Sequence, residues 1–488
     1  MTTLSEYRVP AEQAAGEILA WLSQPRSGSP DPGELLRLLQ LLEAAPLPEA
    51  QRGQFLDLIY SQAIRLAEAL RARLRDQPLP LPRPLRQHTR LITELLGHLA
   101  RDYAATESVR AAPAASAQRL WRAMQAIGWQ IHIHQRIAAP GDAGAWQQVH
   151  AIYQLARTTG LHQQPGPRDT PGIETLYLHL LLAAIAQPTS FTPEEIDFIA
   201  AYIAALPSLP PLQPAPPADD QACFWIDPDK DLPAQALVRR KPAPETCVLY
   251  LDCRALAAHT AALCARLQED ESPAQLRLPP LAGQHSPLPT LRRLQMLWGQ
   301  PARRRFPRRR QSYRATLIGG LDALRTLARG GPAAAEASEW MVINESPDGY
   351  ALMHVHGSSE AIRVGDVVAV QAQREQGSPP WQPCLIRWIV SDNPEHLEIG
   401  LQVLGTEACA AEIAGLALRV PGLWLPERPP LRPQPALVVP AGSLTGHPER
   451  LLLLVEKDNL CVREVRPTRL DEQTASVEVF SVETDHSP

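Results

Sequence analysis

Residues 340–355 of the chain, WMVINESPDGYALMHV, contain the pattern that decides the fold of its central part. The apolar runs WMVI and YALMHV have the aromatic and β-branched residues that strands favour. Between them, Asn344–Gly349 (NESPDG) supplies Ser, Pro, Asp and Gly, whose backbone preferences and local hydrogen bonds favour a tight turn. The stretch therefore predicts a β-hairpin.

The polar residues of this turn suit a purine ligand. The side-chain amide of Asn344 can donate and accept hydrogen bonds at a guanine edge, and the Ser346 hydroxyl can do either. Gly349 permits a positive φ or a close backbone approach. For this stretch taken alone, an ordinary hairpin turn is the simpler alternative.

Strands dominate the sequence from Tyr313 to about Leu404. Their residues are β-branched and mostly alternate between apolar and polar, and turn residues separate the runs. We predict strands at Tyr313–Ile318, Trp340–Ile343, Tyr350–Val355, Asp366–Gln371, Cys384–Ser391 and His396–Val403. Short meandering strands of this kind predict a small closed antiparallel β-barrel.

A run of arginines precedes the first of these strands. Pro301–Arg314 contains seven arginines and no acidic residue, and Arg303–Arg308 within it is RRRFPR. Guanidinium groups bind phosphate bidentately and stack on purine faces, so two arginines four residues apart can clamp a nucleotide. A solvated basic linker is the simpler interpretation of such a run standing alone, and nucleic-acid binding is another use of it.

In this order, arginine run before hairpin turn, residues of about 300 to 405 resemble the PilZ family, bacterial barrels that bind cyclic di-GMP through an RxxxR segment and a (D/N)xSxxG turn. Arg304–Arg308 matches the first pattern, and Asn344–Gly349 matches every fixed position of the second. VGDVVAV at Val364–Val370, and IRWIV followed by IGLQV at Ile399–Val403, look like the middle and closing strands of that barrel.

The resemblance implies a cyclic di-GMP site. Its predicted residues are Arg303, Arg304, Arg305, Arg308, Asn344, Ser346 and Gly349. Arg304 and Arg308 would hold the phosphates and stack on guanine, with the neighbouring arginines assisting. Asn344 and Ser346 would bind a guanine edge, and Gly349 would keep the turn open to the ligand.

Two features depart from the family pattern. Other arginine pairs also have the RxxxR spacing, namely Arg305 with Arg309 and Arg310 with Arg314, so the choice among them stays open. The insertion Leu321–Glu339 separates the two motifs and predicts a helix followed by a flexible loop. This insertion would either cap the barrel or form an oligomer contact.

The sequence up to about Pro207 is predicted to be helical, because apolar residues recur at spacings of three and four between Pro, Gly and Ser. We predict helices at Glu34–Ala45, Gly53–Arg75, Arg86–Tyr103, Ala117–Ile137, Ala143–Thr159, Gly172–Ala186 and Thr192–Ala205. No constant repeat length is present, so the pattern fits a helical bundle and a helical-repeat domain equally well.

The predicted fold class is α+β with several domains. We expect a helical interaction domain at 1–206, a proline-rich linker at 207–220, a small α/β segment at 221–300, the PilZ-like barrel at 301–410 and a C-terminal β segment at 411–488. Strands at Cys223–Ile226 and Val248–Leu251 and helices at Arg254–Leu267 and Leu288–Gly299 are predicted in the α/β segment, and strands at Leu451–Glu456, Cys461–Val465 and Ser476–Val482 near the C-terminus.

The composition is that of a soluble globular chain, with 45% apolar and 20% charged residues among 488. A net charge of −5 disfavours wholesale attraction to nucleic acid or to an anionic membrane. Seven cysteines form no CxxC pair, which favours a reducing compartment. No signal-peptide pattern and no apolar run of membrane-spanning length is visible, so we expect a cytoplasmic protein with no membrane insertion.

The sequence offers no catalytic motif. GxSxG, Walker-type and HExxH strings are absent, so we expect neither enzymatic activity nor a cofactor, with cyclic di-GMP as ligand only. His354 and His356 lie two residues apart on a predicted strand, but no Cys or acidic partner accompanies them. Ordinary core or surface histidines are therefore favoured over metal ligands.

The sequence predicts a cyclic di-GMP receptor that transmits binding to an unidentified protein partner of its helical domain through a reorientation of domains around the arginine run. A protein-interaction scaffold with a non-binding barrel is the alternative. A nucleic-acid binder is disfavoured by the acidic net charge and by the lack of interleaved aromatic residues. A homo-oligomer is compatible with the sequence.

Overall fold

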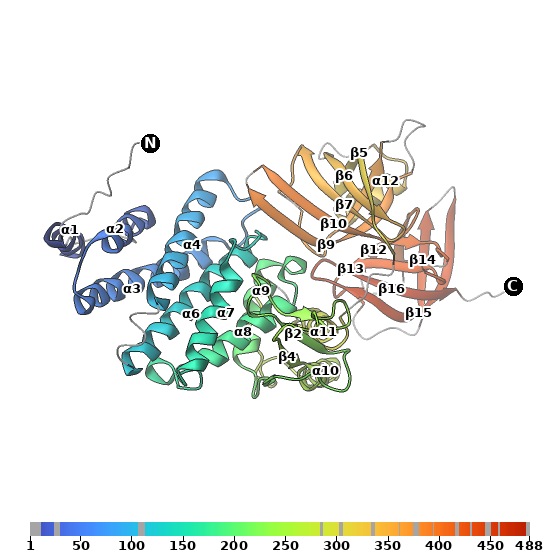
Figure 1. The fold of residues 1–488 in the computed structure, drawn as a ribbon. Helices are drawn as coiled ribbons and strands as arrows, with labels where there is room; N and C mark the ends of the chain where they lie inside the picture. The colour runs from blue at the N-terminus through green and yellow to red at the C-terminus, as the bar shows by residue number, and fades with distance from the viewer. Residues whose placement is uncertain are drawn as a thin grey trace.

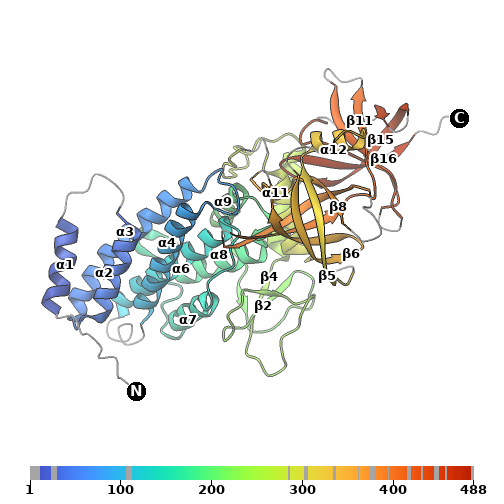
Figure 2. The same ribbon diagram turned by 90° about the horizontal axis from the view of Figure 1, so that it is seen from above.

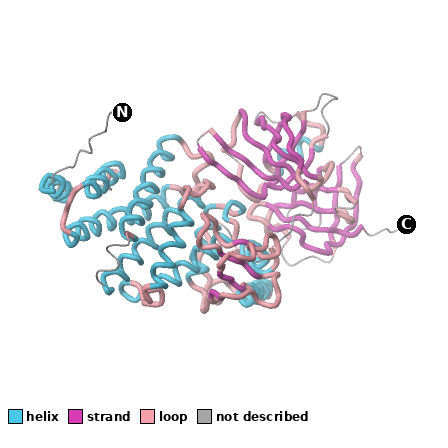
Figure 3. Tube along the Cα trace, viewed as in Figure 1, coloured by secondary structure: helices cyan, strands magenta, loops and turns pink. Residues whose placement is uncertain are grey.

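The computed structural model describes residues 11–23, 30–105, 113–283, 286–301, 306–332, 337–360, 362–373, 380–393, 395–414, 419–429, 432–444, 450–456 and 459–484. These residues form an N-terminal helical region, a four-stranded sheet with two helices, and two closed six-stranded barrels (Figure 1). Most of the helices lie at one end of the molecule and the two barrels at the other, as the colours of Figure 3 show. The predicted α+β fold class, with a helical region ahead of an antiparallel barrel, is confirmed.

The N-terminal helical region is a row of helices that pack mainly on their neighbours in sequence (Figure 2). Its helices are α1 (Ala11–Ser23), α2 (Pro32–Ala44), α3 (Glu49–Arg73), α4 (Arg83–Ala104), α6 (Pro113–Arg136), α7 (Ala145–Thr158), α8 (Ile173–Ile185) and α9 (Pro193–Ala204), with short 3₁₀ turns at Pro167–Asp169 and Pro188–Ser190. Apolar residues at helical spacing, such as Leu35, Leu38, Leu39 and Leu42 of α2, form the buried stripe of each helix. The predicted helices are confirmed, and α1 is an addition to them.

A small α/β segment packs against the end of this row. It contains β1 (Leu212–Gln213), β2 (Cys223–Ile226), β3 (Gln235–Ala236), β4 (Leu249–Asp252), α10 (Arg254–Gln268) and α11 (Leu288–Gly299), with the strands in the order β1-β4-β2-β3. One hydrophobic core runs through both parts, and the buried Trp298 of α11 donates from Nε1 to the Leu182 carbonyl of α8 (3.3 Å). The proline-rich stretch, in which we predicted no element, contains β1, because its backbone pairs with β4.

One buried carboxylate joins α9 to α11. Glu195 accepts a hydrogen bond from the backbone N–H of Thr192 (2.9 Å) and so completes the capping box that begins α9. The same carboxylate accepts from the Thr290 hydroxyl (2.9 Å) and pairs with Arg293 of α11 (3.3 Å). The Arg293 guanidinium lies 3.9 Å from the Phe191 ring, and burial lowers its pKa. Helix α11, which leads to the arginine run, is therefore fixed to the helical region.

The first barrel contains the predicted hairpin. Its strands are β5 (Arg309–Gly319), β6 (Ser338–Ser346), β7 (Gly349–His356), β8 (Val367–Ala372), β9 (Gln382–Asn393) and β10 (His396–Val403), closed in the order β10-β7-β6-β5-β8-β9. Trp340, Leu352 and Ile399 fill its interior, and Trp340 donates from Nε1 to the Ser338 hydroxyl (2.9 Å). All six strands were predicted, because each combines period-two alternation with clear turn residues.

The C-terminal residues close a second barrel instead of adding loose strands. It contains β11 (Cys409–Ala414), β12 (Val420–Leu425), β13 (Ala436–Pro440), β14 (Leu451–Glu456), β15 (Leu460–Gln473) and β16 (Val477–Thr484), in the order β11-β12-β13-β16-β15-β14. The last three strands correspond to the predicted ones, whereas β11, β12 and β13 were missed. These three are short, and their Ala, Gly and Pro content conceals the strand pattern.

The two barrels pack side by side through an apolar interface. Leu385 on the first barrel and Leu423 and Val438 on the second belong to one buried cluster. Arg387 of β9 forms a bidentate ion pair with Glu472 of β15, with N–O distances of 2.9 and 3.0 Å. The barrels therefore share a mixed apolar and ionic interface.

The predicted helix of the insertion between the two motifs is α12 (Leu321–Ala328). It packs on both barrels, with Leu324 buried in their common cluster, and Arg329 at its end pairs with Glu456 of β14 (2.6 and 2.8 Å). Part of the predicted loop after it, 333–336, lies outside the described residues. Helix α12 of the insertion thus contacts both barrels of the same chain.

Replacement of Glu195 by Ala is expected to lower the free energy of unfolding by about 3–5 kcal/mol, because it leaves the Arg293 guanidinium buried without its carboxylate. Thermal or urea unfolding followed by circular dichroism measures the loss. Glu464→Ala removes an exposed ion pair with Arg450 and serves as the control, with little expected change. Equal stability of the two variants would contradict this account.

Candidate functional site

The NESPDG sequence forms the hairpin turn between β6 and β7. Ser346 and Gly349 are paired, so Pro347 and Asp348 make up the two-residue loop. The Ser346 hydroxyl lies 2.6 Å from Asp348 Oδ1 and 3.3 Å from the Gly349 carbonyl oxygen. The Val403 N–H donates to the Asp348 carbonyl (2.9 Å) and ties the loop to the end of β10. Hydrogen bonds within the turn and one from the neighbouring strand β10 therefore stabilise it.

The described turn residues of the candidate site lie on the outer face of the first barrel. Leu352 and Leu401 belong to its core, so their sequence neighbours Ala351 and Gln402 point outwards. Asn344 is paired with Ala351 and shares this outer face. Farther along, Ser346 is paired with Gly349, and Gly349 is paired with Gln402. The backbone pairing thus gathers Asn344, Ser346 and Gln402 at one end of the barrel.

Two side-chain oxygens of this group lack a partner. Asn344 Oδ1 and Gln402 Oε1 are buried and accept no hydrogen bond from the described part of the chain. Unpaired buried acceptors are uncommon and costly. The N1–H and N2–H₂ groups of guanine are donors that can satisfy such oxygens once the side chains covering them move aside. Sequence reasoning missed Gln402, since only the strand register places it opposite the turn.

Of the two predicted reasons for a glycine at position 349, a close backbone approach applies and a positive φ does not. A Cβ at this position would lie 2.3 Å from the Leu401 carbonyl oxygen of β10. The residue therefore permits a close approach of the neighbouring strand, and it does not adopt a positive φ. Its first role is to let β7 and β10 meet at the turn, and the role toward a ligand stays a prediction.

The arginine run enters the barrel beside this turn. Arg309 is paired with Glu345 and Arg310 with Asn344, so the exposed Arg308 immediately before β5 lies at the end of the barrel that carries the turn. Arg310 shares the outer face with Asn344 and is a further candidate that faces the ligand site. The predicted residues Arg303, Arg304 and Arg305 lie outside the described residues.

Of the alternative arginine pairs, Arg310 with Arg314 fits the site poorly. Arg314 is opposite Met341, farther along β6 from the turn, and its guanidinium is paired with Glu339 (2.8 Å). It is therefore already engaged away from the turn residues. The choice between the pairs that begin at Arg304 and Arg305 rests on residues outside the described part of the chain.

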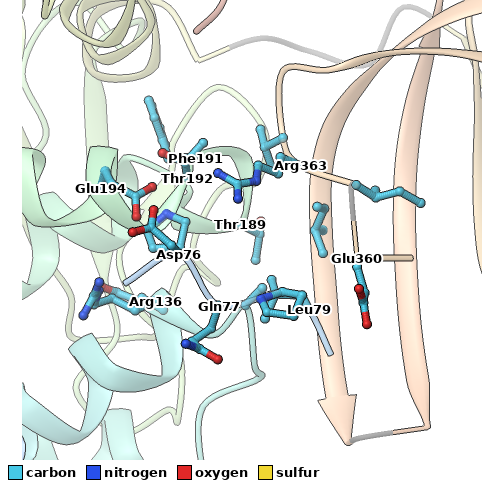
Figure 4. Close-up of a pocket in the computed structure, with 17 residues that line it drawn as sticks. Asp76, Gln77, Leu79, Arg136, Thr189, Phe191, Thr192, Glu194, Glu360 and Arg363 are labelled. Atoms are coloured by element: carbon cyan, nitrogen blue, oxygen red, sulfur yellow. The ribbon is translucent and has the colours of Figure 1, made fainter. Parts of the chain in front are cut away.

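Two cavities lined by described residues lie away from the turn. The pocket of Figure 4 lies between the helical region and the first barrel, lined by residues such as Arg136, Phe191 and Arg363, and has a volume of about 50 Å³. Ligand pockets usually hold about 300–1,000 Å³, so this one is too small for a dinucleotide. A larger cleft of about 1080 Å³ on the helical region, lined by Arg86 and His98 among others, contains none of the predicted site residues.

Among the described residues, no further metal-ligating side chains accompany either histidine of β7. The His354 ring packs against Trp340 with 4.9 Å between the ring centroids, and burial lowers its pKa. His356 is exposed. In the described ranges we find no group of three or more His, Cys, Asp or Glu side chains placed to hold a metal ion.

No described helix combines the length and apolarity needed to cross a bilayer.

Comparison with known families agrees with the barrel and with one of its two motifs. Residues 325–409 match the family model described as "Cyclic-di-GMP receptor FimW, middle PilZ domain". This part of the chain therefore matches a PilZ domain. Residues 14–217 match a second model, "Cyclic-di-GMP receptor FimW, N-terminal domain". The PilZ match begins within α12, so it includes NESPDG but neither RRRFPR nor β5.

Among curated proteins, the chain is similar to the Cyclic-di-GMP receptor FimW of Pseudomonas aeruginosa PAO1. The two are 27% identical over 330 residues, which cover 64% of this chain and 52% of the relative. The chain thus spans about half the length of that relative. Its similarity to FimW extends to the helical region as well as the barrel, as the two family models show.

Replacement of Gly349 by Ala is expected to cost about 1–3 kcal/mol of stability, because the added methyl group must push β7 away from the Leu401 carbonyl. Gly319→Ala is the matched control, since a Cβ there meets no atom within 4 Å. Urea unfolding measures both variants. A Gly349→Ala protein as stable as the control would show that the close approach is unimportant.

Proposed function

We propose that this chain is a cyclic di-GMP receptor that binds the dinucleotide on the outer face of its first barrel. The observation that carries the proposal is a pair of oxygens, Asn344 Oδ1 and Gln402 Oε1, that have no hydrogen-bond partner among the described residues and lie beside the end of an arginine run in a PilZ domain. The similarity to a protein named cyclic-di-GMP receptor supports it. We propose a binding function, with no catalytic step.

The chemistry of the two motifs is complementary to the two parts of the ligand. Arginines 303–305 and Arg308 supply positive charge and planar donor groups for the phosphates and for stacking on guanine. Asn344 and Gln402 supply acceptors for the donors on the guanine edge. Ser346, whose hydroxyl faces Asp348 and the Gly349 carbonyl, keeps the turn in shape and presents its oxygen beside them.

Binding would be transmitted by the segment between α11 and β5. Arg293 fixes α11 to the helical region, and the preceding Arg292 donates to Gln473 of the second barrel (2.6 Å). A ligand that holds the following arginines against the turn would restrict how these parts lie relative to the first barrel. We propose that this reorientation controls the binding of a protein partner to the helical region, or the association of two copies of the chain.

Isothermal titration with cyclic di-GMP tests the proposed site. Ser346→Ala and Arg308→Ala are each expected to weaken binding roughly ten- to a hundredfold, the equivalent of one hydrogen bond to a charged group. Arg419→Ala, which removes an exposed ion pair with Glu412 on the second barrel, should bind like the unaltered chain. Absence of binding by the unaltered chain would favour the protein-interaction scaffold.

Solution scattering tests the proposed reorientation. Saturating cyclic di-GMP is expected to change the radius of gyration or the molecular mass of the unaltered chain and to leave the Ser346→Ala variant unchanged at the same concentration. Identical profiles with and without bound ligand would contradict the proposed transmission. Salt-sensitive retention of DNA by the chain would point instead to a nucleic-acid binder.

A further inference from the structure

An arginine from the second barrel reaches the turn of the proposed site. Arg428 lies in the loop between β12 and β13, and its Nη2 donates to the carbonyl of Pro347, 2.6 Å away. Its Nη1 lies 3.5 Å from the carbonyl oxygen of Val403 at the end of β10. Since Pro347 is one of the two loop residues of NESPDG, one guanidinium bridges the tip of the turn and the adjacent strand end.

The loop that carries Arg428 is itself well held. The backbone groups of Arg428 and Arg432 exchange two hydrogen bonds (2.7 and 2.8 Å). Arg432 donates to the Leu404 carbonyl, just past the end of β10, and to the Pro426 carbonyl (2.7 Å). Burial lowers the pKa of Arg432, and the nearby Arg428 lowers it further. Two arginines of the second barrel thus donate hydrogen bonds to carbonyl oxygens at the end of the first barrel where the site lies.

These contacts add to those that hold the barrels together. The apolar cluster and the pair of Arg387 with Glu472 also join the barrels, and Leu385 of that cluster is paired with Gln402, which is itself paired with Gly349 of the turn. All hydrogen-bond acceptors that the described residues offer to the Arg428 side chain are neutral carbonyl oxygens. Its positive charge is therefore left without a paired carboxylate in the described structure, beside a site proposed to take an anion.

We infer that Arg428 is a positioning residue of the dinucleotide site, which holds the NESPDG turn in its binding shape, so that the site depends on both barrels. This inference rests on the proposed function. A two-residue turn whose tip carbonyl is fixed keeps Asn344 and Ser346 in place before the ligand arrives, which reduces the ordering cost of binding. The charge of Arg428 also makes the potential at this end of the barrel more favourable to phosphate.

The full chain with Arg428→Gln, Arg428→Lys or the control Arg419→Gln tests the inference. In titrations with cyclic di-GMP, Arg428→Gln is expected to weaken binding about tenfold, for loss of one charge-assisted hydrogen bond. Arg428→Lys, which retains a charged donor, should recover most of the affinity. Without ligand, hydrogen exchange of peptides that contain residues 344–350 should be faster in Arg428→Gln and unchanged in the control.

Each result decides the question. Unchanged affinity together with unchanged exchange of the turn in Arg428→Gln would overturn the inference. So would a loss of affinity that Lys does not restore, because that result assigns Arg428 a general structural role. If the unaltered chain does not bind cyclic di-GMP, the proposed function fails, and the ligand-free exchange alone shows whether Arg428 positions the turn.

Discussion

The antiparallel pairing of β5, β6, β7 and β10 is the constraint on which the site depends. Its register places Arg310 opposite Asn344 and Gly349 opposite Gln402, which brings residues far apart in sequence to one end of the barrel. A shift of one residue would turn each of these side chains to the opposite face. The close contact of Gly349 with the Leu401 carbonyl oxygen disfavours such a shift, because only glycine fits there. Gly349 therefore fixes the strand register on which the arrangement of the candidate site depends.

The contacts that the two motifs make with other parts of the protein explain how binding at one site can affect the whole chain. Buried Glu195 joins α9 to α11, and α11 leads into the arginine run, so the first proposed binding motif follows an anchored helix. The second motif is held at its tip by Arg428 of the second barrel. A ligand that contacts both motifs would therefore be connected, through these motifs, to the helical region, the first barrel and the second barrel. This arrangement is what the proposed transmission of binding requires.

The sequence predicted those features that depend on local pattern. Alternation and turn residues sufficed for β5 to β10, and the fixed positions of NESPDG, together with the preceding arginine run and the flanking strands, indicated the resemblance to PilZ domains. The second barrel was only partly predicted, because short strands such as β11 have weak local preference and are stabilised by closure with distant strands. Gln402 and Arg428 could not be predicted at all. Their relation to the turn arises from strand register and from packing between barrels, neither of which leaves a local signal.

The most direct test of the central claim is hydrogen exchange of the full chain with and without cyclic di-GMP, analysed peptide by peptide. If the two motifs form one site, the ligand should slow exchange in residues 301–310 and 344–350 together, and in the loop around Arg428. Protection that is confined to the arginine run, or that appears in the cleft lined by Arg86 and His98 while the turn stays unchanged, would contradict a shared site on the outer face of the first barrel.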